Sequence, residues 1–193
     1  NIEVTCLKKI DDKFIIVGTD SGEMFRCNMH SKKIKKIKSI PPVNNMHVAY
    51  LDKNDEWWIA DNDLKNFDRT YYYDREIIFL VKWNLNNNKW IEYYQKKYPY
   101  IESRHINCIY KLKEFLYVGT DYGLLTLDLI TNKWDLYNSE DGFYNEDIQR
   151  IVHYNDMLYL ATSKGVILFS HIINQTISTN YKFLLNYKIN DIL

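Results

Sequence analysis

The sequence predicts an all-β fold made of repeated four-stranded antiparallel sheets, and two observations carry this prediction. First, the chain repeats itself: four segments each contain an apolar residue followed by a small one, with steps of 42, 59 and 42 residues, which gives a base period of 42 with one insertion of 17. Second, the apolar residues fall in short alternating runs bounded by Asn, Asp and Gly, which is typical of strands. The four repeated pairs are Val17-Gly18, Ile59-Ala60, Val118-Gly119 and Leu160-Ala161.

The third unit shows the elements of one repeat in order. β-Branched and aromatic residues in its apolar runs favour strands, and connections of two to four residues force consecutive strands to pair antiparallel. We expect "VGTDYG" to contain a hairpin turn and not a phosphate-binding loop, because no helix follows it. We also expect Trp134 to pack between neighbouring sheets. The four runs are "INCIYKL" (106–112), "FLYVGT" (115–120), "GLLTLDL" (123–129) and "KWDLYN" (133–138).

Repeats of about 40 to 45 residues with four strands each indicate β-propeller blades. A four-stranded sheet has two apolar faces and must stack against a neighbour on each side, and the small residue of each pair suits the second strand, where adjacent sheets converge. The last run, "YKINDIL", resembles the openings of the third and fourth units, so we expect part of a larger propeller of six to eight blades. The predicted blades of this single partial propeller (1–193) are 1–40, 41–98 with an insert at 61–76, 99–141 and 142–184, and 185–193 starts the next blade.

The composition argues against several classes of function. The 193 residues carry 25 basic and 25 acidic side chains, so no overall field would draw the chain to nucleic acid or to a membrane, and we expect neither partner. The cysteines form no CxxC pair and the histidines are scattered, so we expect no metal, no cofactor and no nucleophilic catalysis. Five lysines in 31–39 are interpreted as a guard against edge pairing on an outer strand, with a local patch for nucleic acid or acidic lipid as the alternative.

The stretch "LYVGTDYGLLTLDLITNKWDLYNSEDGFYNEDIQRIV" resembles the two-component regulator propeller repeat, in which a Leu-Trp-Ile-Gly-Thr-like strand leads through a Gly-Leu turn to an aromatic outer strand and an Asp-Gly-Leu turn. "DEWWIADNDL" and "LYLATSKGVILFS" match parts of the same pattern. The second unit departs from it, with Asp61 in place of Thr and no turn glycine, and the first unit has no Trp. The resemblance implies a non-enzymatic, extracytoplasmic (periplasmic) sensor region of a histidine kinase that detects carbohydrate breakdown products or another small ligand; a cytoplasmic location stays open.

Strand alternation places the loops between the second and third strands of a blade on the same face as the loops between blades. We call this side of the molecule the loop face. Aromatic rings on it could stack on sugar rings or other flat ligands, with charged residues as polar partners. The alternative is that the same residues cap and pack the loops. The candidate ligand-binding residues are Tyr98, Tyr100, Arg104, Asp121, Tyr122, Glu140, Asp141, Phe143 and Tyr144.

No catalytic residue is predicted. A glycoside hydrolase needs two carboxyl groups placed across a cleft, whereas the carboxylates at 140, 141, 146 and 147 cluster in one connection, as solvated loop charges do. A blade segment of a carbohydrate-active enzyme, either a lyase or a glycoside hydrolase, stays open as an alternative function, as does a protein-interaction scaffold. The expected protein partners are the remaining blades of a propeller or another copy of the chain, because the outer faces of an incomplete stack are exposed.

Overall fold

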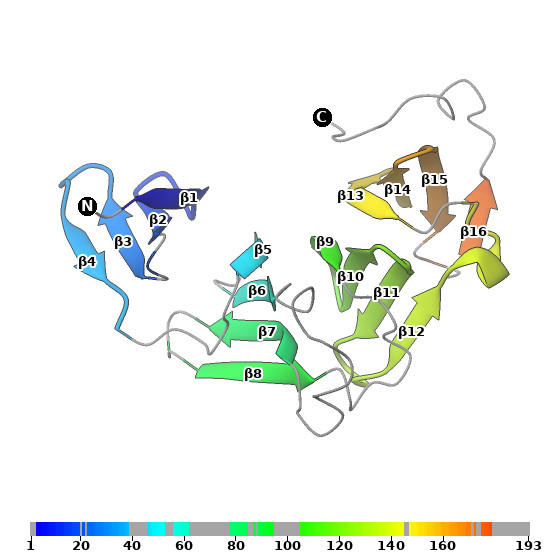
Figure 1. The fold of residues 1–193 in the computed structure, drawn as a ribbon, viewed down its shortest axis with the longest axis horizontal. Helices are drawn as coiled ribbons and strands as arrows, with labels where there is room; N and C mark the ends of the chain where they lie inside the picture. The colour runs from blue at the N-terminus through cyan, green and yellow to red at the C-terminus, as the bar shows by residue number, and fades with distance from the viewer. Residues whose placement is uncertain are drawn as a thin grey trace.

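In the computed structural model, the described residues form four four-stranded antiparallel sheets, each made of consecutive strands. Figure 1 shows the sheets fanned out in an open arc, with the first strand of each sheet on its inner side. This arrangement confirms the predicted all-β propeller blades, which are numbered here from the N-terminus. The structure describes residues 3–19, 21, 23–38, 46–52, 56–61, 78–84, 87, 89–94, 105–144, 147–170, 172 and 175–178.

The strands of each blade follow one another in space as they do in the sequence. The first blade contains β1 (Val4–Lys9), β2 (Phe14–Thr19), β3 (Met24–Asn28) and β4 (Ile34–Lys36), and the second contains β5 (Met46–Leu51), β6 (Glu56–Asp61), β7 (Ile78–Asn84) and β8 (Lys89–Tyr94). The third contains β9 (Ile106–Leu112), β10 (Phe115–Thr120), β11 (Gly123–Asp128) and β12 (Trp134–Tyr137), and the fourth contains β13 (Ile148–Tyr154), β14 (Met157–Thr162), β15 (Gly165–Ser170) and β16 (Gln175–Ser178).

The third blade matches the four predicted runs, and its strands differ from them by at most one residue at an end. The insert at 61–76, apart from Asp61 at the end of β6, and the start of a fifth blade at 185–193 lie outside the described residues, and the blade boundaries and total blade number stay predictions. Within the described part of the chain, no helix is long and apolar enough to cross a bilayer.

Apolar clusters between neighbouring sheets form the core. The cluster between the second and third blades joins Trp58 and Leu80 to Leu116 and Val118, all fully buried. At its outer side the Trp134 ring of β12 meets the Tyr93 ring of β8 edge to face, with 5.9 Å between centroids. Trp134 therefore packs between sheets, as the sequence predicted.

Gly119, the small residue of the repeated pair in the third blade, fills a place with no room for a side chain. A Cβ atom added to Gly119 of β10 would lie 2.5 Å from Cys108 Sγ of the same blade and 2.8 Å from Cγ2 of Ile148, which belongs to the next blade. Both distances are far below van der Waals contact, so a residue larger than glycine would force the third and fourth blades apart. The predicted convergence of sheets at this position is confirmed.

We expect Gly119→Val to lower the free energy of unfolding by about 1 to 3 kcal/mol, because overpacking displaces Ile148 and its strand. Urea denaturation followed by tryptophan fluorescence measures the change. Asp135→Val is the matched control, since it places valine on an exposed position of β12 in the same blade and should stay within about 0.5 kcal/mol of the parent. Equal stability of the Gly119→Val variant and the parent chain would contradict the packing described here.

Candidate functional site

The loop face between the third and fourth blades is the part of the predicted site that the structure describes best. Its hairpin turns are built by the threonine that ends the second strand. Thr120 Oγ1 accepts the backbone N–H of Tyr122 at 3.0 Å and donates to the carbonyl oxygen of Gly123 at 2.8 Å. Thr162 makes the same pair of hydrogen bonds in the fourth blade. Because each threonine bonds within its own turn, the Gly-Thr-Asp motif is a hairpin turn, as predicted.

Asp121 joins this turn to the connection that enters the third blade. Its Oδ1 accepts the backbone N–H of His105 at 3.2 Å, and its own N–H donates to the His105 carbonyl oxygen at 3.1 Å. The turn requires glycine at position 123 for two reasons. Gly123 has a φ of +123°, which L side chains rarely adopt, and a Cβ atom there would lie 2.3 Å from the Tyr137 carbonyl oxygen. Asp121 thus orients the turn that presents Tyr122.

The connection between the third and fourth blades begins with a capped 3-10 helix, η3 (Ser139–Asp141). Asn138 Oδ1 accepts the backbone N–H of Glu140 at 2.9 Å, and Asp141 Oδ2 accepts the backbone N–H of Asn138 at 3.0 Å. Gly142 ends the turn with a φ of +88°. The Asp141 carboxylate therefore caps the turn through the backbone, while the neighbouring Glu140 is exposed.

Phe143 does not belong to the exposed loop surface, which corrects the expectation that its ring could stack on a ligand there. Its side chain is 2% exposed and meets the Phe169 ring of β15 edge to face, with 6.2 Å between centroids. Tyr137 contacts the same Phe169 ring from β12 at 4.9 Å. The aromatic residue after the turn glycine therefore fixes the connection to the fourth blade. Tyr144 is partly buried beside this cluster.

Asp147 fastens the end of the same connection. Its Oδ1 accepts the side-chain amide of Asn107 from β9 at 3.0 Å and that of Gln149 from β13 at 2.6 Å. One carboxylate thus links the first strands of two blades. The sequence predicts a solvated loop charge here, because no local motif identifies a partner such as Asn107, which lies 40 residues away.

Among the predicted ligand-binding residues, the structure brings together Asp121, Tyr122, Glu140, Asp141 and Tyr144 around the third and fourth blades. Of these, Asp121, Glu140 and Asp141 are exposed, whereas Tyr122 and Tyr144 are partly buried. Of the other four, Phe143 is buried, and Tyr98, Tyr100 and Arg104 lie outside the described residues.

The described residues offer little for metal or thiol chemistry. Among them, no group of three or more His, Cys, Asp or Glu side chains could hold a metal ion. Burial raises the pKa of the Cys108 thiol to about 12, so the residue stays protonated and packs against the fourth blade as an apolar side chain.

Comparison with solved structures shows the same fold at low sequence identity. The extracellular domain of a proposed one-component system from B. thetaiotaomicron aligns over 92% of this chain with a TM-score of 0.65 and 15% identity, and that of a proposed hybrid two-component system from the same organism aligns over 93% with a TM-score of 0.60 and 15% identity. BamB from Moraxella catarrhalis aligns over 91% with a TM-score of 0.56 and 11% identity. The chain has the fold of β-propeller blades.

The chain spans 22% and 25% of the two extracellular domains and about half, 48%, of BamB. No family model matches the sequence, and no curated protein matches it. The likeness to extracellular domains of signalling systems agrees with the resemblance noted in the sequence, and at these identities it shows the fold.

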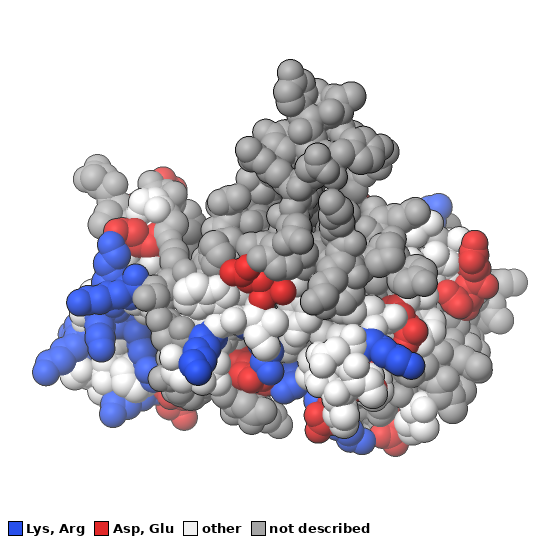
Figure 2. Space-filling view, turned by 90° about the horizontal axis from the view of Figure 1, so that it is seen from below, with Lys and Arg blue, Asp and Glu red and all other residues white. Residues whose placement is uncertain are grey.

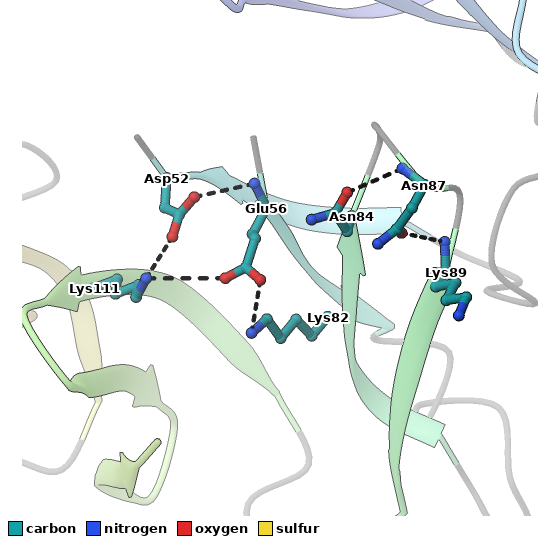
Figure 3. Close-up of polar contacts among 7 residues, drawn as sticks. All are labelled: Asp52, Glu56, Lys82, Asn84, Asn87, Lys89 and Lys111. Carbon is teal, nitrogen blue, oxygen red and sulfur yellow. Dashed lines mark hydrogen bonds and ion pairs between the residues drawn. The ribbon is translucent and has the colours of Figure 1, made fainter. Parts of the chain in front are cut away.

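The opposite face of the molecule carries a polar cluster that no sequence motif predicts. In Figure 3, Asp52 and Glu56 of the second blade point toward Lys111 at the end of β9 in the third. Lys111 Nζ lies 2.5 Å from Asp52 Oδ2 and 4.0 Å from Glu56 Oε2, and Lys82 Nζ lies 2.8 Å from Glu56 Oε1. The Asp52 side chain is only 4% exposed, so the cluster is an ion-pair network that joins two blades.

Figure 2 shows Lys and Arg side chains gathered over the first blade. The lysines at 32, 33, 35, 36 and 38 are exposed on and beside β4, which pairs only with β3 in its sheet, and Lys36 forms an ion pair with Glu23. The lysine-rich segment is therefore on an outer strand, as predicted, where charge disfavours edge pairing.

We expect Lys111→Met to lower the free energy of unfolding by about 3 kcal/mol, because the variant leaves the buried Asp52 carboxylate without its cation. Chemical denaturation measures the change. Lys113→Met is the matched control: Lys113 is exposed two residues further along, and its substitution should be nearly neutral. If both variants lost the same stability, the network would not hold the two blades together.

Proposed function

We propose that this chain is a non-enzymatic, ligand-binding region of an extracytoplasmic signalling receptor, and that its ligand, a carbohydrate or another small molecule, binds the loop face around the third and fourth blades. The proposal combines three lines of support: the organisation of the loops, the roles of the carboxylates and the fold of the extracellular domains described above.

The observation that carries the proposal is the way the loop face is held in place. Asp121 ties a hairpin turn to an inter-blade connection, and Asp147 ties the first strands of two blades together. Because these loops are already held in place, Tyr122 and Glu140 would lose little conformational entropy when a ligand binds. An aromatic side chain and a carboxylate are suitable groups for stacking on a sugar ring and accepting its hydroxyl hydrogens.

The carboxylates support binding over hydrolysis. Asp121 and Asp141 accept backbone N–H groups within the loops, and Asp147 accepts two side-chain amides. A glycoside hydrolase instead places two carboxyl groups on either side of a sugar, one of them available as a proton donor. Asp121, Asp141 and Asp147 therefore act as structural acceptors, which favours a binding role.

The extracytoplasmic location rests on the fold shared with extracellular domains of signalling systems. The loop face would then meet soluble ligands outside the cytoplasm, and the response would pass to whatever part of the receptor contacts these blades.

A glycan array carrying oligosaccharides from partial digests of pectin, xylan and mucin glycans tests the proposal. We expect the chain to bind one class of oligosaccharide, and we expect Tyr122→Ala and Glu140→Ala each to weaken that binding at least tenfold. Glu114→Ala is the control, because Glu114 is exposed in the turn between β9 and β10 on the opposite face.

Two results would contradict the proposal. Unchanged binding by the Tyr122→Ala and Glu140→Ala variants would remove the loop face as the site, and no binding to any arrayed oligosaccharide would remove carbohydrate as the ligand class. Mass spectrometry of the bound oligosaccharides after incubation checks the chemistry, since cleavage products would contradict a non-enzymatic role.

A further inference from the structure

The first strand of every blade contains a β-bulge at the same place, near its loop-face end. In each blade one residue is extra, because it lies between two residues whose partners on the second strand are adjacent in the sequence. A bulge takes its residue out of the regular alternation of faces and re-aims its side chain. The four bulge residues are Thr5, His47, Asn107 and Gln149.

The bulge residues are all polar, but no two of them are the same. Where packing determines the residue, the blades repeat one small type, glycine or alanine. Those positions are Gly18, Ala60, Gly119 and Ala161. At the bulge the blades instead keep polarity and vary the chemical group, from a hydroxyl to an imidazole to two amides of different length. Different polar groups held at fixed places are what orients a small ligand in a binding site.

The structure describes the side chains of two bulge residues, and one carboxylate oxygen holds both. Asp147 Oδ1 accepts Asn107 Nδ2 at 3.0 Å and Gln149 Nε2 at 2.6 Å. Because a carboxylate only accepts, the NH₂ groups of both amides face Asp147, and their carbonyl oxygens lie on the other arm of each amide. Both residues are partly exposed, and no described residue donates a hydrogen bond to Asn107 Oδ1 or Gln149 Oε1. Asp147 therefore holds two amides together and leaves their acceptor oxygens available.

The amide pair belongs to the same part of the loop face as Tyr122. His105, two residues before Asn107, accepts the backbone N–H of Asp121 and donates its own N–H to the Asp121 carboxylate. Asp147 ends the connection that carries η3. Figure 1 shows that β9 and β13, which carry the two amides, are on the inner side of the arc. The amide pair thus lies at the inner end of the proposed site.

We propose that Asn107 and Gln149 determine the specificity of the loop-face site by accepting hydrogen bonds from neighbouring hydroxyl groups of the ligand, and that Asp147 is the positioning residue that orients both amides. The inference rests on the function proposed above, and it adds the chemistry that the ligand must offer at this end of the site. A ligand of the same shape without hydroxyl hydrogens would leave both oxygens unpaired. A site that hydrogen-bonds a hydroxyl group rejects such an analogue.

The array of pectin, xylan and mucin oligosaccharides, printed with an O-methylated copy of each probe, tests the inference. O-Methylation keeps the sugar rings and their oxygens but removes the hydroxyl hydrogens. We expect the parent chain to bind the hydroxylated form at least about tenfold more tightly than its O-methylated copy. Asn107→Leu and Gln149→Leu should each weaken binding of the hydroxylated form about tenfold, which lowers the ratio of the two affinities. Glu114→Leu, in the exposed turn of the third blade on the opposite face, is the matched control and should keep both affinities.

Two variants of Asp147 separate positioning from folding. Asp147→Asn retains an oxygen that can accept both amide N–H groups, whereas Asp147→Ala removes it. We expect Asp147→Ala to lower the affinity ratio as the leucine variants do, and Asp147→Asn to restore most of it. Chemical denaturation of both variants reports their stability. A purely structural role for Asp147 would weaken binding of the hydroxylated and O-methylated forms equally and leave the ratio unchanged, which would overturn the positioning role.

The outcomes distinguish this inference from the function on which it rests. An unchanged affinity ratio in Asn107→Leu and Gln149→Leu, with binding still weakened by Tyr122→Ala, would overturn the specificity role alone. Absence of oligosaccharide binding by the parent chain would overturn the specificity role and the carbohydrate ligand together.

Discussion

A four-stranded sheet with two apolar faces is stable only between two neighbours, and the rest of this structure depends on that constraint. Trp58, Leu116 and Phe169 are fully buried because they lie between sheets. Where the third and fourth blades converge, the packing leaves no space for even one more carbon atom: a Cβ at Gly119 would overlap Cys108 and Ile148. The repeat in the sequence records this geometry: every blade solves the same packing problem with residues of similar size.

Polar groups join the blades at both ends of the strands. The groups that make these contacts have structural roles. On one face, Lys111 links to Asp52 across the second and third blades. On the other, Asp147 bonds Asn107 and Gln149 across the third and fourth. Asp52 and Asp147 are engaged in these contacts, so they are not candidates for catalysis. In the proposed binding role, the hairpin turns of the loop face would present Tyr122 and Glu140 to a ligand.

Much of the fold could be predicted because its signals are local or repeated. Alternation and short turns located the strands of the third blade, and the recurring small residue located the convergence of sheets. The site was harder to predict, because exposure depends on neighbours distant in sequence. Phe143 follows a turn glycine, and the sequence left open whether it stacks on a ligand or packs the loops; Phe169 of the next blade covers it. The pairing of Asp52 with Lys111 spans 59 residues and has no local motif, so only the packed blades reveal it.

The most direct test of the account compares equivalent strands of the first and third blades by amide hydrogen exchange with mass spectrometry. β2 and β10 occupy the same place in their blades, but β10 is covered on both sides and β2 on one. In dilute solution, we predict that β2 exchanges faster than β10. Equal protection of the two strands in dilute solution would contradict the claim that burial between blades determines their stability.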